Sequence, residues 1–265
     1  MKLKLYQVDA FTDKLFGGNP AAVIPLESWI EDELMQKIAM ENNLSETAFI
    51  VKTDDGYHIR WFTPEYEIDL CGHATLASAY VIKNFLEPQV TEFQFTTEKA
   101  GELRASSKDG KYSLDFPSRI PKVSETPASL LESLGISNAI EVLRSRDYFV
   151  VLPDEEAVKN VEPDFEAMKQ VDTFGVIITA KGKTADVVSR CFYPNAGIPE
   201  DPVTGSAHCN IVPYWAQKLG KNKLHCLQLS ERGGNMECEL HGDRVYMTGK
   251  CVLYMRGEID VSGYL

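Results

Sequence analysis

Two halves of this 265-residue chain repeat one another, and this repetition limits the possible folds more than any other feature of the sequence. The segment ArgTrpPheThrPro at 60–64 recurs as ArgCysPheTyrPro at 190–194, which is 130 residues later. GlyHisAla at 72–74 then matches GlySerAla at 205–207, now 133 residues later, so an insertion of three residues separates the two spacings. Similarity at one long period predicts two structural units of the same kind.

The repetition predicts two pseudo-symmetric lobes, with residues 1–118 in the first and 119–265 in the second. We expect the last strand to cross back to the N-terminal lobe and the active-site cleft to lie between the lobes. Short alternating or apolar runs predict strands in both halves. These runs are 3–10, 20–25, 47–52, 57–62, 93–97, 102–106, 111–116, 140–144, 147–152, 174–180, 185–192, 224–229, 236–240, 244–248 and 250–256. The fold class is therefore predicted as α+β.

Three helices are predicted among these strands. Ser28 and Glu31 have the spacing of a capping box, which predicts a helix over 28–42. A second helix, over about 73–85, is apolar on nearly every face, which is typical of a helix buried at the centre of a unit. Its counterpart runs from 205 to about 219, and Pro213 is expected to kink it or end its first part. Each lobe is thus predicted as a curved mixed sheet wrapped around one central helix.

Both central helices begin with glycine, at Gly72 and Gly205. The first turn of a helix has unpaired N–H groups and a partial positive charge, and glycine lets a ligand approach the backbone closely. We therefore expect a carboxylate or another anion to bind at these helix starts.

The halves differ at residues that can transfer protons. His73 corresponds to Ser206, and Glu46 corresponds to an apolar stretch around 174–176. Asp201 lies in the inserted segment just before the second central helix. Positions where a duplicated scaffold departs from symmetry point toward function. Each of these residues also has an ordinary structural interpretation, as a solvated loop carboxylate for Glu46 and a turn residue for Asp201.

Composition excludes several classes of protein. The net charge is −12, from 27 basic and 39 acidic residues, so the basic surface that binds a phosphate backbone is missing and nucleic acid is not an expected partner. No apolar run has the roughly 18 residues of a membrane-spanning helix, and the first residues do not form a secretory signal. These observations favour a cytoplasmic protein that does not contact a membrane.

Metal and nucleotide cofactors are not predicted. The sequence has no CxxC, HExxH or HxxxH pair, and its glycine clusters match neither GxGxxG nor GxxxxGK[ST]. The six cysteines are expected to be reduced thiols, since the chain is long and has no secretory signal.

Several motifs in order resemble the PhzF family of phenazine-biosynthesis-like isomerases, which has the diaminopimelate epimerase-like fold. They span essentially the whole chain, and they are ValAspAlaPheThr at 8–12, GlyGlyAsnProAlaAlaVal at 17–23, LeuSerGluThrAlaPhe at 44–49, ArgTrpPheThrPro at 60–64, AspLeuCysGlyHisAlaThr at 69–75 and GluAspProValThrGlySerAla at 200–207. The resemblance implies a biosynthetic isomerase that needs no cofactor or metal, acts on a small carboxylic acid and forms a homodimer.

The resemblance also assigns roles to individual residues. It implies that Glu46 carries a proton between carbons of a small carboxylic acid, with cyclic amino and hydroxy acids among the candidates. His73, Asp201 and Ser206 are implied as the other catalytic residues. The substrate-binding residues implied by the resemblance are Asn19, Gly72, Ala74 and Gly205.

Two alternative functions remain open at this point. The first is a racemase or epimerase of a small amino acid derivative. Related epimerases use one cysteine from each lobe, whereas here Cys71 corresponds to Thr204 and Cys209 lies farther along the helix. Cys71 is then expected to be a packed small residue. The second is a non-catalytic protein of the same fold that binds a metabolite or a partner.

Overall fold

The computed structural model of the protein describes residues 1–264 and divides into two compact units. Unit 1 contains Met1–Asp115 and Thr248–Leu265, and unit 2 contains Phe116–Met247. Two strands continue from one unit into the other, β8 (Lys111–Pro117) and β17 (Arg244–Gly249).

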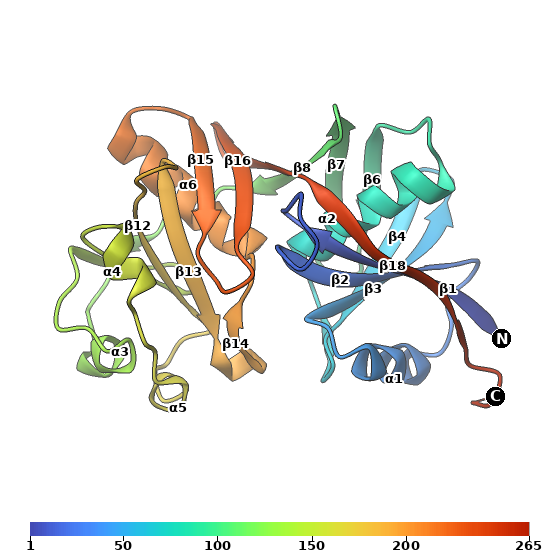
Figure 1. Ribbon diagram of the computed structural model, residues 1–265, viewed down its shortest axis with the longest axis horizontal. Coiled ribbons are helices and arrows are strands. Elements are labelled where there is room, and N and C mark those ends of the chain that lie inside the picture. The colour runs from blue at the N-terminus through green and yellow to red at the C-terminus, as the bar shows by residue number, and fades with distance from the viewer. Residues whose placement is uncertain (265) are drawn as a thin grey trace. The chain divides into compact units, whose positions relative to one another are not determined.

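Unit 1 is mainly sheet, with two α-helices and one turn of π-helix (Figure 1). Its other strands are β1 (Lys2–Ala10), β2 (Asn19–Leu26), β3 (Glu46–Thr53), β4 (Gly56–Phe62), β5 (Glu67–Ile68), β6 (Glu92–Thr96), β7 (Glu102–Lys108) and β18 (Cys251–Asp260). Its helices are α1 (Asp32–Asn42), α2 (Gly72–Val81) and η1 (Ile82–Leu86).

Unit 2 has the same kinds of element and more short helices. Its strands are β9 (Lys122–Val123), β10 (Glu141–Arg144), β11 (Tyr148–Val151), β12 (Val176–Lys181), β13 (Val187–Tyr193), β14 (Ile198–Asp201), β15 (Lys223–Gln228) and β16 (Gly234–His241). Its helices are α3 (Ala128–Ser133), α4 (Glu155–Lys159), α5 (Phe165–Met168), the 3₁₀ turn η2 (Pro194–Ala196) and α6 (Gly205–Leu219).

The strands of the two units pair in the same pattern. The pairs β2–β3 and β4–β6 are parallel, as are β11–β12 and β13–β15. The pairs β1–β2, β3–β4 and β6–β7 are antiparallel, as are β10–β11, β12–β13 and β15–β16. Both central helices begin at the predicted glycines, Gly72 and Gly205. The predicted fold class, α+β with two similar units, is confirmed.

Each unit packs helices on its sheet. In unit 1, α2 contacts β1, β2, β3, β7 and β18, so the sheet curves around this helix, while α1 packs on β3 and β4. In unit 2, α6 contacts β15 and β16, while α4 packs on β12 and β13. Because α1 and α2 both pack on β3, this strand is buried on both faces from Glu46 to Ile50. Side chains at the start of β3 are therefore shielded from bulk water.

The start of the first helix differs from the prediction. Helix α1 begins at Asp32 and not at Ser28, and Glu31, its N-cap residue, makes no side-chain capping bond. The predicted capping box is therefore wrong. Trp29 explains the difference, because its ring lies edge-on to His58 at 5.1 Å and under the Arg60 guanidinium at 5.4 Å. These tertiary contacts hold the segment before Asp32 outside the helix.

Pro213 does not end the second central helix, so that half of the expectation is wrong. Helix α6 continues through Pro213 to Leu219. Proline lacks the N–H that would bond the carbonyl four residues earlier, which here is that of Cys209. The amide of Arg119 donates to this carbonyl at 2.8 Å instead. A bond from outside the helix thus replaces the bond that proline removes.

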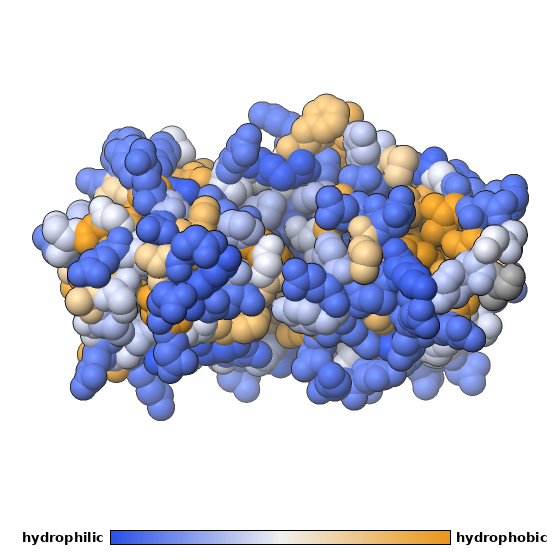
Figure 2. Space-filling model, turned by 90° about the horizontal axis from the view of Figure 1, so that it is seen from below, coloured by the Kyte–Doolittle hydropathy of each residue, from blue (hydrophilic) through white to orange (hydrophobic). Residues whose placement is uncertain are grey.

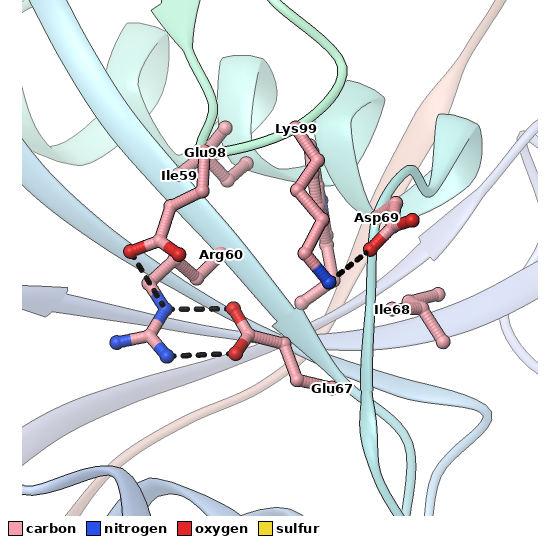
Figure 3. A pocket seen from close by; sticks show the side chains of 8 residues that line it. Ile59, Arg60, Glu67, Ile68, Asp69, Glu98 and Lys99 are labelled. Atoms are coloured by element: carbon pink, nitrogen blue, oxygen red, sulfur yellow. Dashed lines mark hydrogen bonds and ion pairs between the residues drawn. The ribbon is translucent and has the colours of Figure 1, made fainter.

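An arginine–glutamate ion pair holds the approach to each central helix. In unit 1, Arg60 donates two parallel bonds to Glu67, both of 2.7 Å (Figure 3). In unit 2, Arg190 donates equivalent bonds to Glu200, of 2.8 and 2.9 Å. Each glutamate lies five residues before the glycine that begins the helix. Two parallel bonds fix both position and orientation, so each pair anchors the strand that leads into a central helix.

The face in Figure 2 is largely hydrophilic, with apolar residues in small separate groups. Within residues 1–264, no helix combines the length and the apolar character that crossing a membrane requires.

Loss of the Arg60–Glu67 pair is expected to destabilise the fold. The Arg60 side chain is only 8% exposed, so Glu67→Met leaves a buried guanidinium without its main partner. We expect the free energy of unfolding to fall by about 3 kcal/mol in urea titrations, and the double variant Arg60→Met/Glu67→Met to recover most of this loss. Lys99→Met is the matched control, because it removes the exposed Lys99–Asp69 pair nearby and should cost less than about 1 kcal/mol. Equal losses in the two single variants would contradict the anchoring role.

Candidate active site

The first central helix begins without a side-chain cap. Cys71 is its N-cap residue, in an extended conformation, and its carbonyl accepts the amide of Thr75 at 3.2 Å. Gly72, His73 and Ala74 follow as the first residues of α2, and His73 and Ala74 are buried. The N–H groups of the first turn are therefore left for other partners.

Glu46 and His73 form a buried ion pair. Glu46 is the first residue of β3, and the closest atoms, Glu46 Oε2 and His73 Nε2, are 3.0 Å apart. The two side chains are 8% and 5% exposed. The contact between these two atoms has the distance of an ion pair but not the geometry of a hydrogen bond. Neither atom has a hydrogen bond to another described residue. Glu46 is thus not a solvated loop carboxylate.

The thiol of Cys71 lies on the other side of the His73 ring. Its Sγ is 3.5 Å from His73 Nδ1. Burial of the imidazole opposes its protonation, but the charge of the Glu46 carboxylate and the hydrogen bond with Cys71 outweigh burial, and the pKa of His73 is raised well above its usual value. Burial and the Glu46 charge raise the pKa of Cys71 to about 11, so it is a neutral thiol at pH 7. The imidazole is therefore a cation between a thiol and a carboxylate.

These three side chains also contain the atoms that metals bind. One ligand-type atom from each of Glu46, Cys71 and His73 lies within 4.8 Å of the others. However, the imidazole directs Nε2 to Glu46 and Nδ1 to Cys71, so one ion cannot contact all three until the ring turns. The arrangement suits proton transfer better than metal binding.

The approach to the second central helix is a buried hydrogen-bond network. Asp201 ends β14, is 9% exposed, and accepts the hydroxyl of Thr204 at 2.5 Å. Gln228 accepts the Thr204 amide at 2.8 Å and donates to the Asp201 carbonyl at 2.7 Å. Thr204 is the N-cap residue of α6, as Cys71 is of α2, so the predicted correspondence holds in the structure. Sequence reasoning missed Gln228, which lies in a strand far from any motif.

Sequence reasoning also missed Arg146, which lies beside Ser206. Its Nη2 donates to the hydroxyl oxygen of Ser206, the second residue of α6, at 3.4 Å. One signal could have identified this arginine. In the strand registers, Ala21 pairs with Glu46 and Tyr148 pairs with Val176, the residue 130 positions after Glu46. Asn19 lies two residues before Ala21, and Arg146 lies two residues before Tyr148. The two residues therefore occupy equivalent positions in the two units.

The structure gathers the predicted site residues into two groups. Glu46, His73, Gly72, Ala74 and Asn19 belong to unit 1, where Asn19 is fully buried at the start of β2. Asp201, Gly205 and Ser206 belong to unit 2. The roles assigned to these residues remain predictions.

Comparison with known proteins identifies the family. A model described as phenazine biosynthesis-like protein, PhzC-PhzF, matches residues 8–257. The chain belongs to this family. It is similar to an uncharacterized isomerase of Pseudomonas aeruginosa, with 49% identity covering 98% of this chain and 100% of the relative. The family and the isomerase class predicted from the sequence are both confirmed.

Solved structures of the PhzC-PhzF family are also similar. A PhzF-family protein of Enterococcus faecalis has a TM-score of 0.95 and 46% identity, covering 98% of this chain and all of that one. A hydroxyproline epimerase of Agrobacterium vitis has a TM-score of 0.61 at 12% identity, covering 98% of this chain and 93% of that one. This second likeness shows a shared fold only.

The ionisation of His73 should depend on Glu46. In Glu46→Gln we expect a lower pKa for His73, because the variant removes a negative charge beside a buried cation. A pKa raised on folding stabilises the native state below about pH 6.5, and this stabilisation is lost as the pH rises through the folded value. Titration of the imidazole by ¹³C NMR measures the change, with exposed Glu41→Gln as the control. An unchanged His73 titration in Glu46→Gln would contradict the ion pair.

His208 should weaken the fold in acid. Its Nδ1–H donates to the Thr204 carbonyl at 2.8 Å, its Nε2 has no hydrogen bond to a described residue, and burial lowers its pKa to about 4. The unfolded chain takes up this proton near pH 6.5 and the native protein does not, so stability falls between these values by about 3 kcal/mol. Urea titrations at several pH values should show a shallower acid decline for His208→Gln. Parallel declines would refute the assignment.

Proposed function

We propose that this protein is a cofactor-independent isomerase of the PhzF type that moves a proton between carbons of a small carboxylic acid. Glu46 is the proton carrier in this proposal. The observation that carries it is the buried contact of 3.0 Å between Glu46 and His73. A carboxylate shielded from water beside a cationic imidazole is a base held close to a second proton-handling group.

The proposed reaction needs only proton transfer. Glu46 takes a proton from one carbon of the substrate, and the electron pair of the C–H bond enters the adjacent bond system. The protonated Glu46 then returns the proton to a different carbon, so the product is an isomer. His73 stabilises the carboxylate before the transfer and orients it. Cys71 takes no part in this scheme, since its thiol is neutral.

The residues of unit 2 are proposed to hold the substrate. Helix α6 has no side-chain cap, so Gly205 and Ser206 can offer donors to the substrate's carboxylate. Asp201 is proposed to orient a polar substituent. Binding of the carboxylate by these donors stabilises the negative charge that develops when the carbon loses its proton. Asn19, Gly72 and Ala74 are proposed to contact the substrate from unit 1.

The other parts of the proposal follow from membership in the family. We infer a cytoplasmic, biosynthetic enzyme that acts as a homodimer. Sedimentation velocity of the full chain measures the oligomeric state directly.

Glu46→Gln is expected to abolish turnover and preserve ligand binding. The amide keeps the size of the side chain and removes the base, so the rate should fall by at least about 10³-fold, or roughly 4 kcal/mol in activation free energy. A library of small carboxylic acids incubated with the protein and followed by ¹H NMR identifies a substrate through its conversion to an isomer, whether or not the transferred proton exchanges with solvent. The variant is then assayed with that acid, and its dissociation constant is compared with that of the wild type.

Two further variants make the comparison specific. Glu41→Gln makes the same chemical change at an exposed position and should leave the rate unchanged. Asp201→Asn should mainly raise KM, because Asp201 is proposed to bind and not to carry the proton. Normal turnover by Glu46→Gln would refute the mechanism. Exchange at one stereocentre that yields both stereoisomers would instead indicate a racemase or epimerase.

A further inference from the structure

Arg146 is held rigidly while part of it remains open to solvent. It donates to Asp147 through Nε at 3.0 Å and through Nη2 at 2.9 Å, and its guanidinium carbon lies 4.3 Å from the centre of the Phe174 ring. The Asp147 side chain is 1% exposed, whereas that of Arg146 is 40% exposed. An arginine fixed by a buried carboxylate and an aromatic ring has already lost much of the rotamer freedom that ligand binding would otherwise cost.

Several hydrogen-bond donors around Arg146 have no acceptor. Its Nη1 makes no hydrogen bond to a described residue. The hydroxyl of Tyr193, a residue only 5% exposed, also has none among residues 1–264. The Tyr193 ring lies 5.7 Å from the ring of Phe174, on which Arg146 stacks, so the two side chains are neighbours. Burial lowers the pKa of Arg146, but Asp147 outweighs burial and raises that pKa. Burial and the Asp147 charge raise the pKa of Tyr193, so its O–H keeps its proton.

The start of α6 adds donors at the same place. Ser206 Oγ is 3.4 Å from Arg146 Nη2, and the first turn of this 15-residue helix has no side-chain cap. A fixed guanidinium, a buried hydroxyl and uncapped amides thus lie together, and all of them donate. A buried donor is normally satisfied, so the Tyr193 hydroxyl beside this partly exposed guanidinium indicates an acceptor supplied by a ligand.

We propose that Arg146 is the specificity-determining residue of this enzyme, and that it selects substrates with a carboxylate and rejects their neutral analogues. Nη1 of Arg146 and the hydroxyl of Tyr193 donate to the carboxylate, and Ser206 and the α6 amides complete its binding. This inference rests on the proposed function, since it defines how the substrate of that reaction is recognised. The position of Arg146 also fits a role in substrate binding, because it is equivalent in unit 2 to the position of Asn19, a proposed substrate-binding residue, in unit 1.

Binding of benzoate and benzamide to the full chain tests the proposal. The two probes have similar shapes and differ in charge, so calorimetry should show benzamide binding at least about 10-fold more weakly to the wild type. Arg146→Gln should weaken benzoate binding by about 10- to 100-fold and leave benzamide binding nearly unchanged. Tyr193→Phe should weaken benzoate binding by a smaller factor.

Arg144→Gln is the matched control for charge. Arg144 lies two residues before Arg146, and its guanidinium also stacks on an aromatic ring, at 4.7 Å from the centre of Tyr148. It also donates a hydrogen bond to the carbonyl of Asp172. Its loss should change benzoate binding less than about twofold, because it makes no contact with Ser206. The double variant Arg146→Gln/Asp147→Asn removes the buried charge that Arg146→Gln leaves unpaired, so it separates a binding defect from unfolding.

The outcomes distinguish this inference from the proposed function. Benzoate binding at wild-type strength by the folded double variant would overturn the inference, as would equal binding of benzoate and benzamide by the wild type. Neither result bears on the isomerisation catalysed through Glu46. Conversely, normal turnover by Glu46→Gln would refute the proposed function and leave the role of Arg146 in binding intact.

Discussion

In each half of the chain a largely buried arginine binds a glutamate through two parallel hydrogen bonds, and the central helix begins five residues after that glutamate. The pairs Arg60–Glu67 and Arg190–Glu200 are the same structural solution, used once in each unit. Separating the glutamate from the arginine would leave the charge of the arginine with little water to solvate it. The strand that carries the glutamate is therefore held in one favourable position. The start of each central helix depends on that position.

On this repeated scaffold the two units carry different chemistry. In unit 1 the helix start brings a cationic His73 against the carboxylate of Glu46. In unit 2 the position of Glu46 is taken by Val176, and Ser206 lies beside Arg146. The first arrangement suits proton transfer, and the second is rich in hydrogen-bond donors, which suits recognition of an anion. The proposed division between a reacting unit and a binding unit follows from this difference.

The sequence predictions failed where tertiary contacts outweigh local preference. The capping box at Ser28 has the correct spacing, yet the contacts of Trp29 with His58 and Arg60 delay the helix to Asp32. Pro213 is a reliable helix breaker in isolation, and a bond from a distant amide preserves the helix here. Neither outcome was accessible from a local pattern, because the decisive partner in each case lies far along the chain.

The sequence alone determined the duplicated α+β fold, the glycines that begin the central helices, and the residues that distinguish the two halves. These features are encoded in hydrophobic periodicity, in motif spacing and in the repeat of motifs along the chain, all of which can be read before the chain folds. Only the tertiary structure decided that Glu46 faces His73 at 3.0 Å, that Cys71 is a neutral thiol, and that Arg146 lies beside Ser206. Ionisation and donor satisfaction depend on burial and on groups brought together from distant segments, so they arise only when the chain has folded.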